Sequence, residues 1–369
     1  MKSKRNIPLF WPSYNGRKIQ KLVNKAFPAD MSNRWLGQAH KVDEFEQEFG
    51  KKFGYKYCVA VSSGTASIEL AYHLLDFKKG DEVITPVLTC TATNLHFARN
   101  GIKIKFADIK DDLTIDPDDV ERKITPKTRA IVAVTLGGLP VDKKLFKIAK
   151  KHKIPVVIDA AQSLGVGEKH GEYICHSFQA IKHFTTGDGG MLVVKNKEDY
   201  KRAKKLRWFG IDREAKMRAN WQPYKKRQMT MDIKEPGYKF QMNDVEAMMG
   251  LVGLQHSDEY LKHRKRITDY YDKNIKCATV SGGSCWLYGI LVSDRDHVAS
   301  ELEKAGVDTN MAHLRNDIFT AFGGKREKLP KMNELESKYI YIPINTKMTM
   351  DDAKYVAKKL NEILKPQLV

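Results

Sequence analysis

One lysine, Lys182, lies between an apolar stretch and a glycine-rich turn, in the segment 177–190. Residues 174–178 and 190–194 are predicted strands, and the Gly/Asp run between them supplies the turn. We expect Lys182 to point inward, where desolvation by apolar walls lowers the pKa of an amine toward ~7–8. Such an amine acts as a base or forms a Schiff base with a carbonyl. The alternative is a lysine whose stem is buried and whose ammonium reaches solvent.

A carboxylate, Asp159, ends the apolar run 154–159, which is typical of a parallel strand buried on both faces with its functional residue at the carboxyl end. Enzymes that use pyridoxal 5'-phosphate need a Schiff-base lysine and an acid that keeps the pyridine nitrogen protonated. A carboxylate about 4 Å from that nitrogen contributes on the order of 4 kcal/mol at an effective dielectric near 20. Asp159 fits this role, and a cap of the next helix is the alternative.

A strand, a turn of small residues and a helix start follow one another in residues 59–75. The turn contains Gly64 and Thr65, and apolar residues recur behind it at helical spacing. Free amides and the positive end of the helix dipole bind anions there, and Gly64 lets the backbone come close. Ser177 offers a hydroxyl to the same group. This pattern predicts a phosphate site, with an ordinary helix cap as the alternative.

These residues together resemble the fold-type I aminotransferases, and more closely the DegT/StrS family of nucleotide-sugar aminotransferases. The resemblance covers nearly the whole chain, and the order and spacing of its motifs make it specific. The motifs are residues 45–49, 61–66, 81–86, 89–94, 159–162, 177–190 and 237–242.

The resemblance implies pyridoxal 5'-phosphate as the cofactor, with Lys182 and Asp159 as the catalytic pair. Lys182 would form the Schiff base, and Asp159 would be the pyridinium partner. Gln162 would lie against the ring or its 3-hydroxyl. The turn and strand residues implied to bind the cofactor, mainly its phosphate, are Gly64, Thr65, Ala66 and Ser177.

Two positions depart from the family pattern. Cys90 stands where an aromatic residue commonly stacks on the cofactor ring, so the flat platform is replaced by a small polarizable contact. Lys239 stands where the family usually has an asparagine that reaches the phosphate of the neighbouring subunit. A lysine serves an anion as a point charge, so Lys239 is a candidate phosphate ligand contributed within a homodimer. A solvated surface lysine is the alternative.

The implied reaction moves an amino group from glutamate or glutamine to a keto sugar on a nucleoside diphosphate. The expected acceptor is a 4-keto-6-deoxyhexose, and the product is an amino-dideoxy sugar nucleotide. His313 and Arg315 lie where relatives present sugar-contacting side chains, with plain surface charge as the alternative.

Several rival functions remain. They are a 3-keto sugar aminotransferase, a sugar dehydratase of the same fold, an amino-acid aminotransferase and a DNA-binding regulator. The dehydratase branch replaces the lysine with histidine, whereas here Lys182 is present and His183 follows it. The amino-acid enzyme is disfavoured because we find no clear arginine pair for two carboxylates.

Alternating apolar runs and helical patterns from about residue 59 to 194 predict an α/β fold with a sheet covered on both faces. The resemblance implies a large three-layer α/β/α domain with a mostly parallel central sheet, placed at residues 1–250 with the N-terminal segment included. A smaller C-terminal α/β domain is placed at 251–369. Its predicted strands are 286–292 and 339–343, and its predicted helices are 297–305 and 349–364.

Composition narrows the remaining classes. The chain has 369 residues, 64 Lys and Arg against 45 Asp and Glu, and a net charge of +19. The cations are dispersed over predicted amphipathic helices, and no nucleic-acid-binding motif is present, so we expect no nucleic-acid partner. A basic field also attracts a nucleoside diphosphate. Five scattered cysteines predict reduced thiols and neither a metal nor an iron–sulfur cluster. Without a signal-peptide pattern or membrane span, a cytoplasmic enzyme is expected.

Overall fold

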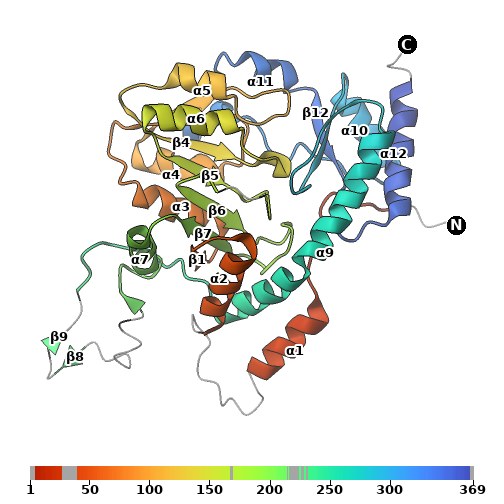
Figure 1. Cartoon of the computed structure of the whole chain (residues 1–369). Coiled ribbons are helices and arrows are strands. Elements are labelled where there is room, and N and C mark those ends of the chain that lie inside the picture. The colour runs from red at the N-terminus through yellow and green to blue at the C-terminus, as the bar shows by residue number, and fades with distance from the viewer. Residues whose placement is uncertain are drawn as a thin grey trace.

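A computed structural model gives the arrangement of the chain (Figure 1). It describes residues 5–26, 40–166, 169–213, 215, 224–225, 228–229 and 232–365. The largest sheet consists of β1 (Tyr57–Val61), β2 (Glu82–Pro86), β3 (Lys103–Ala107), β4 (Thr128–Val134), β5 (Val156–Asp159), β6 (Tyr173–Ser177) and β7 (Gly190–Val194). Its strand order is β1-β7-β6-β5-β4-β2-β3.

The large sheet is mostly parallel. Strands β3, β2, β4, β5 and β6 run in one direction, while β7 is antiparallel to both of its neighbours. Strands β5 and β7 are buried along their whole length, as expected for short apolar runs covered on both faces. Asp159 at the end of β5 lies beside Cys175 in the middle of β6.

Helices cover both faces of this sheet. One face packs against α2 (His40–Phe53), α5 (Pro117–Lys123), α6 (Lys143–His152) and the first half of α9 (Asp244–Asn274). The other packs against α3 (Gly64–Leu74), α4 (Ala92–Asn100) and α7 (Lys197–Leu206). Alternate residues of β4 enter the two cores, with Ile131 in the first and Val132 in the second. The predicted three-layer α/β/α arrangement is therefore present.

The long helix α9 runs from the large sheet to a smaller antiparallel one (Figure 1). It begins with a capping box in which Asn243 and Glu246 exchange hydrogen bonds. The small sheet has the strands β10 (Ala278–Val280), β11 (Tyr288–Leu291) and β12 (Tyr339–Ile342), and its core includes residues of α10 (Arg295–Lys304) and α12 (Met350–Leu364). The predicted boundary at residue 250 falls inside α9, and the division into two domains stays a prediction.

The predicted strand 286–292 is longer than the observed β11. The amides of Trp286 and Leu287 donate to the carbonyl of Gly137, in the short helix η1 (Leu136–Gly138), instead of to a neighbouring strand. Trp286 therefore lies on the connection between β10 and β11, which is hydrogen-bonded to η1. This tertiary hydrogen bonding is not encoded in the local apolar pattern.

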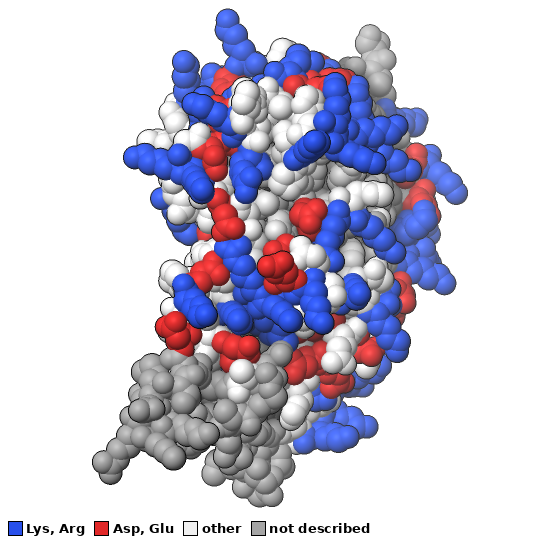
Figure 2. Space-filling view, turned by 60° about the vertical axis from the view of Figure 1, so that its left-hand side comes forward, with Lys and Arg blue, Asp and Glu red and all other residues white. Residues whose placement is uncertain are grey.

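The remaining described elements are short or peripheral. They are α1 (Gly16–Ala26), β8 (Tyr224–Lys225), β9 (Gln228–Met229), η2 (Asn316–Ile318), η3 (Thr320–Phe322) and α11 (Pro330–Leu335). Among the described helices, none has both the length and the apolar character required to cross a membrane. Lys and Arg are spread over the face shown in Figure 2, with Asp and Glu between them, which agrees with the dispersed cations expected from the sequence.

Candidate active site

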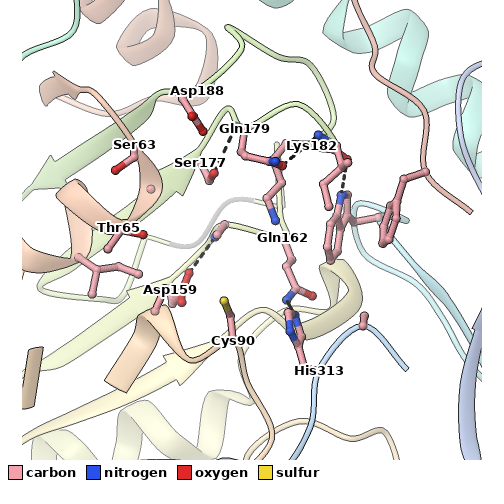
Figure 3. A pocket seen from close by; sticks show the side chains of 18 of the residues that line it. Ser63, Thr65, Cys90, Asp159, Gln162, Ser177, Gln179, Lys182, Asp188 and His313 are labelled. Carbon is pink, nitrogen blue, oxygen red and sulfur yellow. Dashed lines mark hydrogen bonds between the residues drawn. The ribbon is translucent and has the colours of Figure 1, made fainter. Parts of the chain in front are cut away.

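A cavity of about 490 Å³ opens where β5 and β6 end and α3 begins (Figure 3). Eight of the predicted site residues line it: Gly64, Thr65, Cys90, Asp159, Gln162, Ser177, Lys182 and His313. Ser63, Gln179 and Asp188 add polar groups, and Phe10, Ile181 and Trp286 add apolar ones. Residues that are far apart in the chain thus meet in one pocket, as the sequence predicted for the strand ends.

Asp159 is buried and tightly held. Its Oδ2 accepts a hydrogen bond of 2.8 Å from the hydroxyl of Thr93, and its Oδ1 accepts one of 3.1 Å from the amide of Ala161. Burial raises the pKa of Asp159, while Thr93, the Ala161 amide and the charge of Lys182 act in the opposite direction. A positively charged group bound beside it would therefore find a fixed, desolvated anion.

Lys182 is half-buried and opens onto the pocket. Desolvation lowers its pKa to about 8, and Asp159 is the main group that acts in the opposite direction. This agrees with the value expected from the sequence. An amine with this pKa is neutral in an appreciable fraction of molecules near neutral pH, so it can act as a nucleophile or a base.

The start of α3 forms the opposite end of the pocket. Figure 3 shows Ser63, Thr65 and Ser177 gathered on one side of the cavity, with Lys182 on the other. Ser63 caps the helix by accepting from the amide of Ala66 at 3.0 Å. A Cβ on Gly64 would lie 2.6 Å from the Cβ of Ser177, so this close approach requires glycine.

Gln162 and His313 form a second network on the pocket wall. The Nε2 atoms of the two side chains are 2.6 Å apart, and Gln162 Oε1 accepts from the amide of Gly137 at 2.7 Å. The amide nitrogen of Gln162 donates, so His313 Nε2 accepts, which requires a neutral imidazole. Burial and the charge of Lys182 lower the pKa of His313 to about 4, in agreement with that hydrogen bond.

Three predicted site residues do not line the cavity: Ala66, Lys239 and Arg315. Ala66 contributes its backbone amide to the helix cap. Lys239 lies beside Trp208 and has its Nζ 5.8 Å from the ring centroid of Phe209.

Arg315 is buried and makes two hydrogen bonds to the carboxylate of Asp317, at 2.7 and 2.6 Å. A buried guanidinium paired in this way holds its own loop. Within the chain as described, the structure gives Arg315 a structural contact rather than a position in the pocket.

Sequence reasoning missed several residues at the site, among them Thr93, Phe10 and Trp286. Thr93 belongs to a recognised motif, but its bond to Asp159 required the fold. Phe10 and Trp286 stack with their ring centroids 5.8 Å apart, although they lie far apart in the sequence. The apolar pattern around Trp286 indicated a strand, and no local signal places it beside Lys182.

The donor set fits pyridoxal 5'-phosphate. An amine is available for the aldehyde, a buried carboxylate for the pyridine nitrogen, and a helix start with two serines for the phosphate. Asp188 also lines the pocket. In the described part of the chain, no cluster of His, Cys, Asp and Glu could hold a metal ion.

Comparison with known proteins gives one consistent family. The model of the DegT/DnrJ/EryC1/StrS aminotransferase family matches residues 17–361. A protein of Campylobacter jejuni named UDP-4-amino-4,6-dideoxy-N-acetyl-beta-L-altrosamine transaminase is 30% identical, and the match covers 95% of this chain and 97% of that protein.

Solved structures agree with this match. The sugar aminotransferase CalS13 from Micromonospora echinospora superposes with a TM-score of 0.86 at 28% identity, covering 96% of this chain and 99% of that one. Spr1654 from Streptococcus pneumoniae, in its PLP form, superposes with a TM-score of 0.86 at 26% identity, covering 99% and 100%. These similarities confirm the predicted fold class, the fold-type I α/β architecture.

Proposed function

This chain belongs to the DegT/DnrJ/EryC1/StrS aminotransferase family, and on that premise we propose that it aminates the 4-keto position of a nucleotide-linked 4-keto-6-deoxyhexose. It is a sugar aminotransferase that depends on pyridoxal 5'-phosphate. The proposed amino donor is glutamate or glutamine, and the proposed product is an amino-dideoxy sugar nucleotide. One observation supports the assignment above all others: Lys182, Asp159 and the start of α3 line the same cavity.

The choice of acceptor rests on chemistry and on one relative. The Campylobacter jejuni relative carries in its name a UDP-linked 4-amino-4,6-dideoxy sugar. The net charge of +19 favours the approach of an anionic nucleoside diphosphate. The charge supports a nucleotide-linked substrate, and the name of the relative supports amination at position 4. Position 3 is the alternative that the experiment must separate.

In the proposed reaction, Lys182 has two tasks. Its Nζ would hold the cofactor, and as a free amine it would carry a proton within the pocket. A pKa of about 8 suits this second task, because proton transfer is efficient when the pKa of the base lies near the working pH. The cofactor, when bound, supplies an electron-accepting ring next to the carbon that loses the proton.

The other residues of the pocket would hold and orient the cofactor. Asp159, fixed by Thr93 and the Ala161 amide, would keep the ring nitrogen protonated. Ser63, Thr65 and Ser177 would hold the phosphate with the amides at the start of α3. Neutral His313 keeps the Gln162 amide in place against the cofactor ring or its 3-hydroxyl. Cys90 would make a small contact where relatives have an aromatic ring.

We further propose a homodimer, in which Lys239 reaches the phosphate held by the partner subunit. Lys239 does not line the pocket of its own chain, which is compatible with a role across an interface. Chemical crosslinking and sedimentation test the dimer. In the dimer, K239A is expected to weaken cofactor binding about tenfold, as for the loss of one charge-assisted contact. The cytoplasmic location stays a prediction.

The experiment that tests the function incubates purified protein with pyridoxal 5'-phosphate, glutamate or glutamine, and a panel of keto sugars. The panel pairs 4-keto and 3-keto hexoses with UDP, GDP and dTDP, and mass spectrometry identifies the products. We expect an amine in place of the 4-keto oxygen. Loss of water without amination would instead establish a dehydratase, and amination at position 3 alone would contradict the proposed regiochemistry. K182A is the matched control and is expected to give no product.

A further inference from the structure

The amine of Lys182 lies over the face of an indole. Its Nζ is 4.0 Å from the ring centroid of Trp286, and both residues line the cavity. Lys182 is labelled in Figure 3. Trp286 is 2% exposed. Among the described residues, Lys182 Nζ makes no hydrogen bond or ion pair, so the indole face is the close polar contact of this ammonium. A cation at this distance from a tryptophan ring is attracted by the ring quadrupole.

We propose that Trp286 is a positioning residue that holds the charged amine of Lys182 inside the pocket whenever this amine is not joined to the cofactor. The inference rests on the proposed role of Lys182 and adds the position of its amine when the amine is free. A released lysine has four rotatable bonds and would otherwise sample many conformations. Contact with the indole would keep the free amine of Lys182 close to the cofactor with which it must react again.

The indole is itself held in place from several sides. Its Nε1 donates to the carbonyl of Ile181 at 3.1 Å, so the ring is tied to the residue next to Lys182. The carbonyl of Trp286 accepts from buried Arg264 at 3.2 Å. On the edge of the pocket, Phe10 stacks on the ring at an interplanar angle of 29°. The platform therefore cannot turn without breaking these contacts.

The backbone before Trp286 indicates the same constraint. Cys285 has a φ of 52°, in the left-handed region that a residue with a Cβ seldom adopts. Such a conformation persists where surrounding contacts determine it. Here the amides of Ser284 and Trp286 both donate into the Gly137–Gly138 turn, at 3.0 and 3.1 Å, which fixes the connection that carries the indole.

The electrostatic effect of the indole has a definite sign. Desolvation disfavours the charged amine, whereas the indole face favours it. The titratable groups that act on Lys182 or respond to its charge are Asp159, Cys90, His183 and His313. Asp159 raises the pKa of Lys182, as does Cys90. Removing the indole while these groups stay in place should lower the pKa of Lys182 further and release its side chain.

The test uses cofactor-free protein whose lysines carry ¹³C-dimethyl labels, which keep the positive charge. In the wild type, one dimethyl resonance should be shifted upfield by the ring current of Trp286, and its absence from K182R assigns it. In W286L this resonance should move to the position of exposed lysines, and its pKa should fall by about half to one unit. W286F keeps an aromatic face and should retain most of the upfield shift and of the pKa.

A matched control exists on the surface. Lys347 Nζ lies 3.6 Å from the ring centroid of Trp11, which is 40% exposed. W11L removes the same kind of pair and should leave the Lys182 resonance unchanged. Thermal unfolding of each variant checks that it is folded, and W286M, which also lacks an aromatic face, replaces W286L if W286L does not fold.

A second measurement follows the absorbance that appears when pyridoxal 5'-phosphate is added at different pH values. The pH midpoint of this rate should fall in W286L by the same amount as the Lys182 pKa. An unchanged Lys182 resonance and pKa in folded W286L would overturn the role of Trp286. Covalent cofactor binding by K182A would instead overturn the proposed function, so the two failures are distinct.

Discussion

The two walls of the pocket are built differently. On the strand wall, Asp159 and Ser177 lie at the ends of β5 and β6, next to the start of α3. On the loop wall, Trp286 and His313 lie on connections outside the strands. Their partners, Ile181 and Gln162, are 105 and 151 residues away in the chain. The strand wall follows from the sheet, whereas the loop wall exists only once distant segments have packed together.

The two walls therefore have different roles in the proposed reaction. The strand wall offers the fixed charge and the phosphate site, so its geometry must be rigid before any ligand arrives. The loop wall surrounds the amine of Lys182, which is the group proposed to change its contacts during turnover. A change on the strand wall should therefore damage chemistry or cofactor binding, and a change on the loop wall should alter where the amine lies.

The largest effect is expected for the fixed charge of the strand wall. D159N keeps the shape of the side chain but removes the anion, which is worth about 4 kcal/mol at 4 Å and an effective dielectric of 20. Turnover should fall by about 10³-fold, while the cofactor should still attach to Lys182 and give its visible absorbance. Steady-state rates and an absorbance spectrum of the same sample measure both quantities.

The matched control for this substitution is T93V. It removes the hydroxyl that donates to Asp159 Oδ2 but leaves the carboxylate in place, so a loss of about tenfold is expected. If D159N and T93V lost the same amount of activity, the charge of Asp159 would not be the important property, and the strand wall would act through its hydrogen bonds alone.

A smaller effect is expected for Lys182, which lies between the two walls. It concerns the pH dependence of the free energy of unfolding. In the folded cofactor-free protein the pKa of Lys182 is about 8, below the value of about 10.4 in an unfolded chain. Between these pH values the unfolded chain binds more protons, so the free energy of unfolding rises with pH. From pH 7 to 10.5 the wild type should gain about 3 kcal/mol relative to K182M in urea unfolding.

The exposed residue Lys347 provides the comparison for this pH series. K347M removes an exposed lysine, whereas K182M removes a lysine that opens into the pocket. Over the same pH range the wild type should therefore gain more stability relative to K182M than relative to K347M. An equal pH dependence in the two series would show that the amine of Lys182 is not desolvated in the folded protein. Lys182 would then be a solvated residue of an open pocket.

The sequence predicted one wall better than the other, for a physical reason. Asp159 lies at the end of β5, Gly64 begins α3, and Lys182 lies in the glycine-rich connection after β6. Turn residues mark such positions in the sequence, and the ends of parallel strands converge. Trp286 lay in an apolar run that indicated a strand, because local hydrophobicity carries no information about the distant turn that accepts its amide. Arg315 was predicted to contact sugar, but its pairing with Asp317 depends on a loop conformation that charge alone does not reveal.

The position of β7 in the sheet could not be predicted from the sequence either. It follows β6 in the chain and pairs with it, but it also pairs with β1, which lies more than a hundred residues earlier. The alternation of apolar runs predicted a sheet covered on both faces and not its order, because strand order is set by the crossover connections and by which helices cover which face.

The smallest of these effects tests how tightly the strand wall is fitted. A Cβ in G64A would lie 2.6 Å from the Cβ of Ser177, so the start of α3 must move away from β6. Its backbone amides would then no longer point toward the phosphate. Overpacking costs about 1–2 kcal/mol, and the dissociation constant of the cofactor should rise about tenfold, as measured by absorbance titration.

The double variant G64A/S177G separates crowding from a general loss of the helix start. Replacing Ser177 by glycine removes the Cβ that collides, so the added methyl group should be tolerated better in S177G than in the wild type. The interaction energy of this double-mutant cycle should then be favourable by about 1 kcal/mol. A cycle with no interaction energy would mean that Gly64 is required for its own backbone freedom, and that the contact between α3 and β6 does not set the position of the phosphate site.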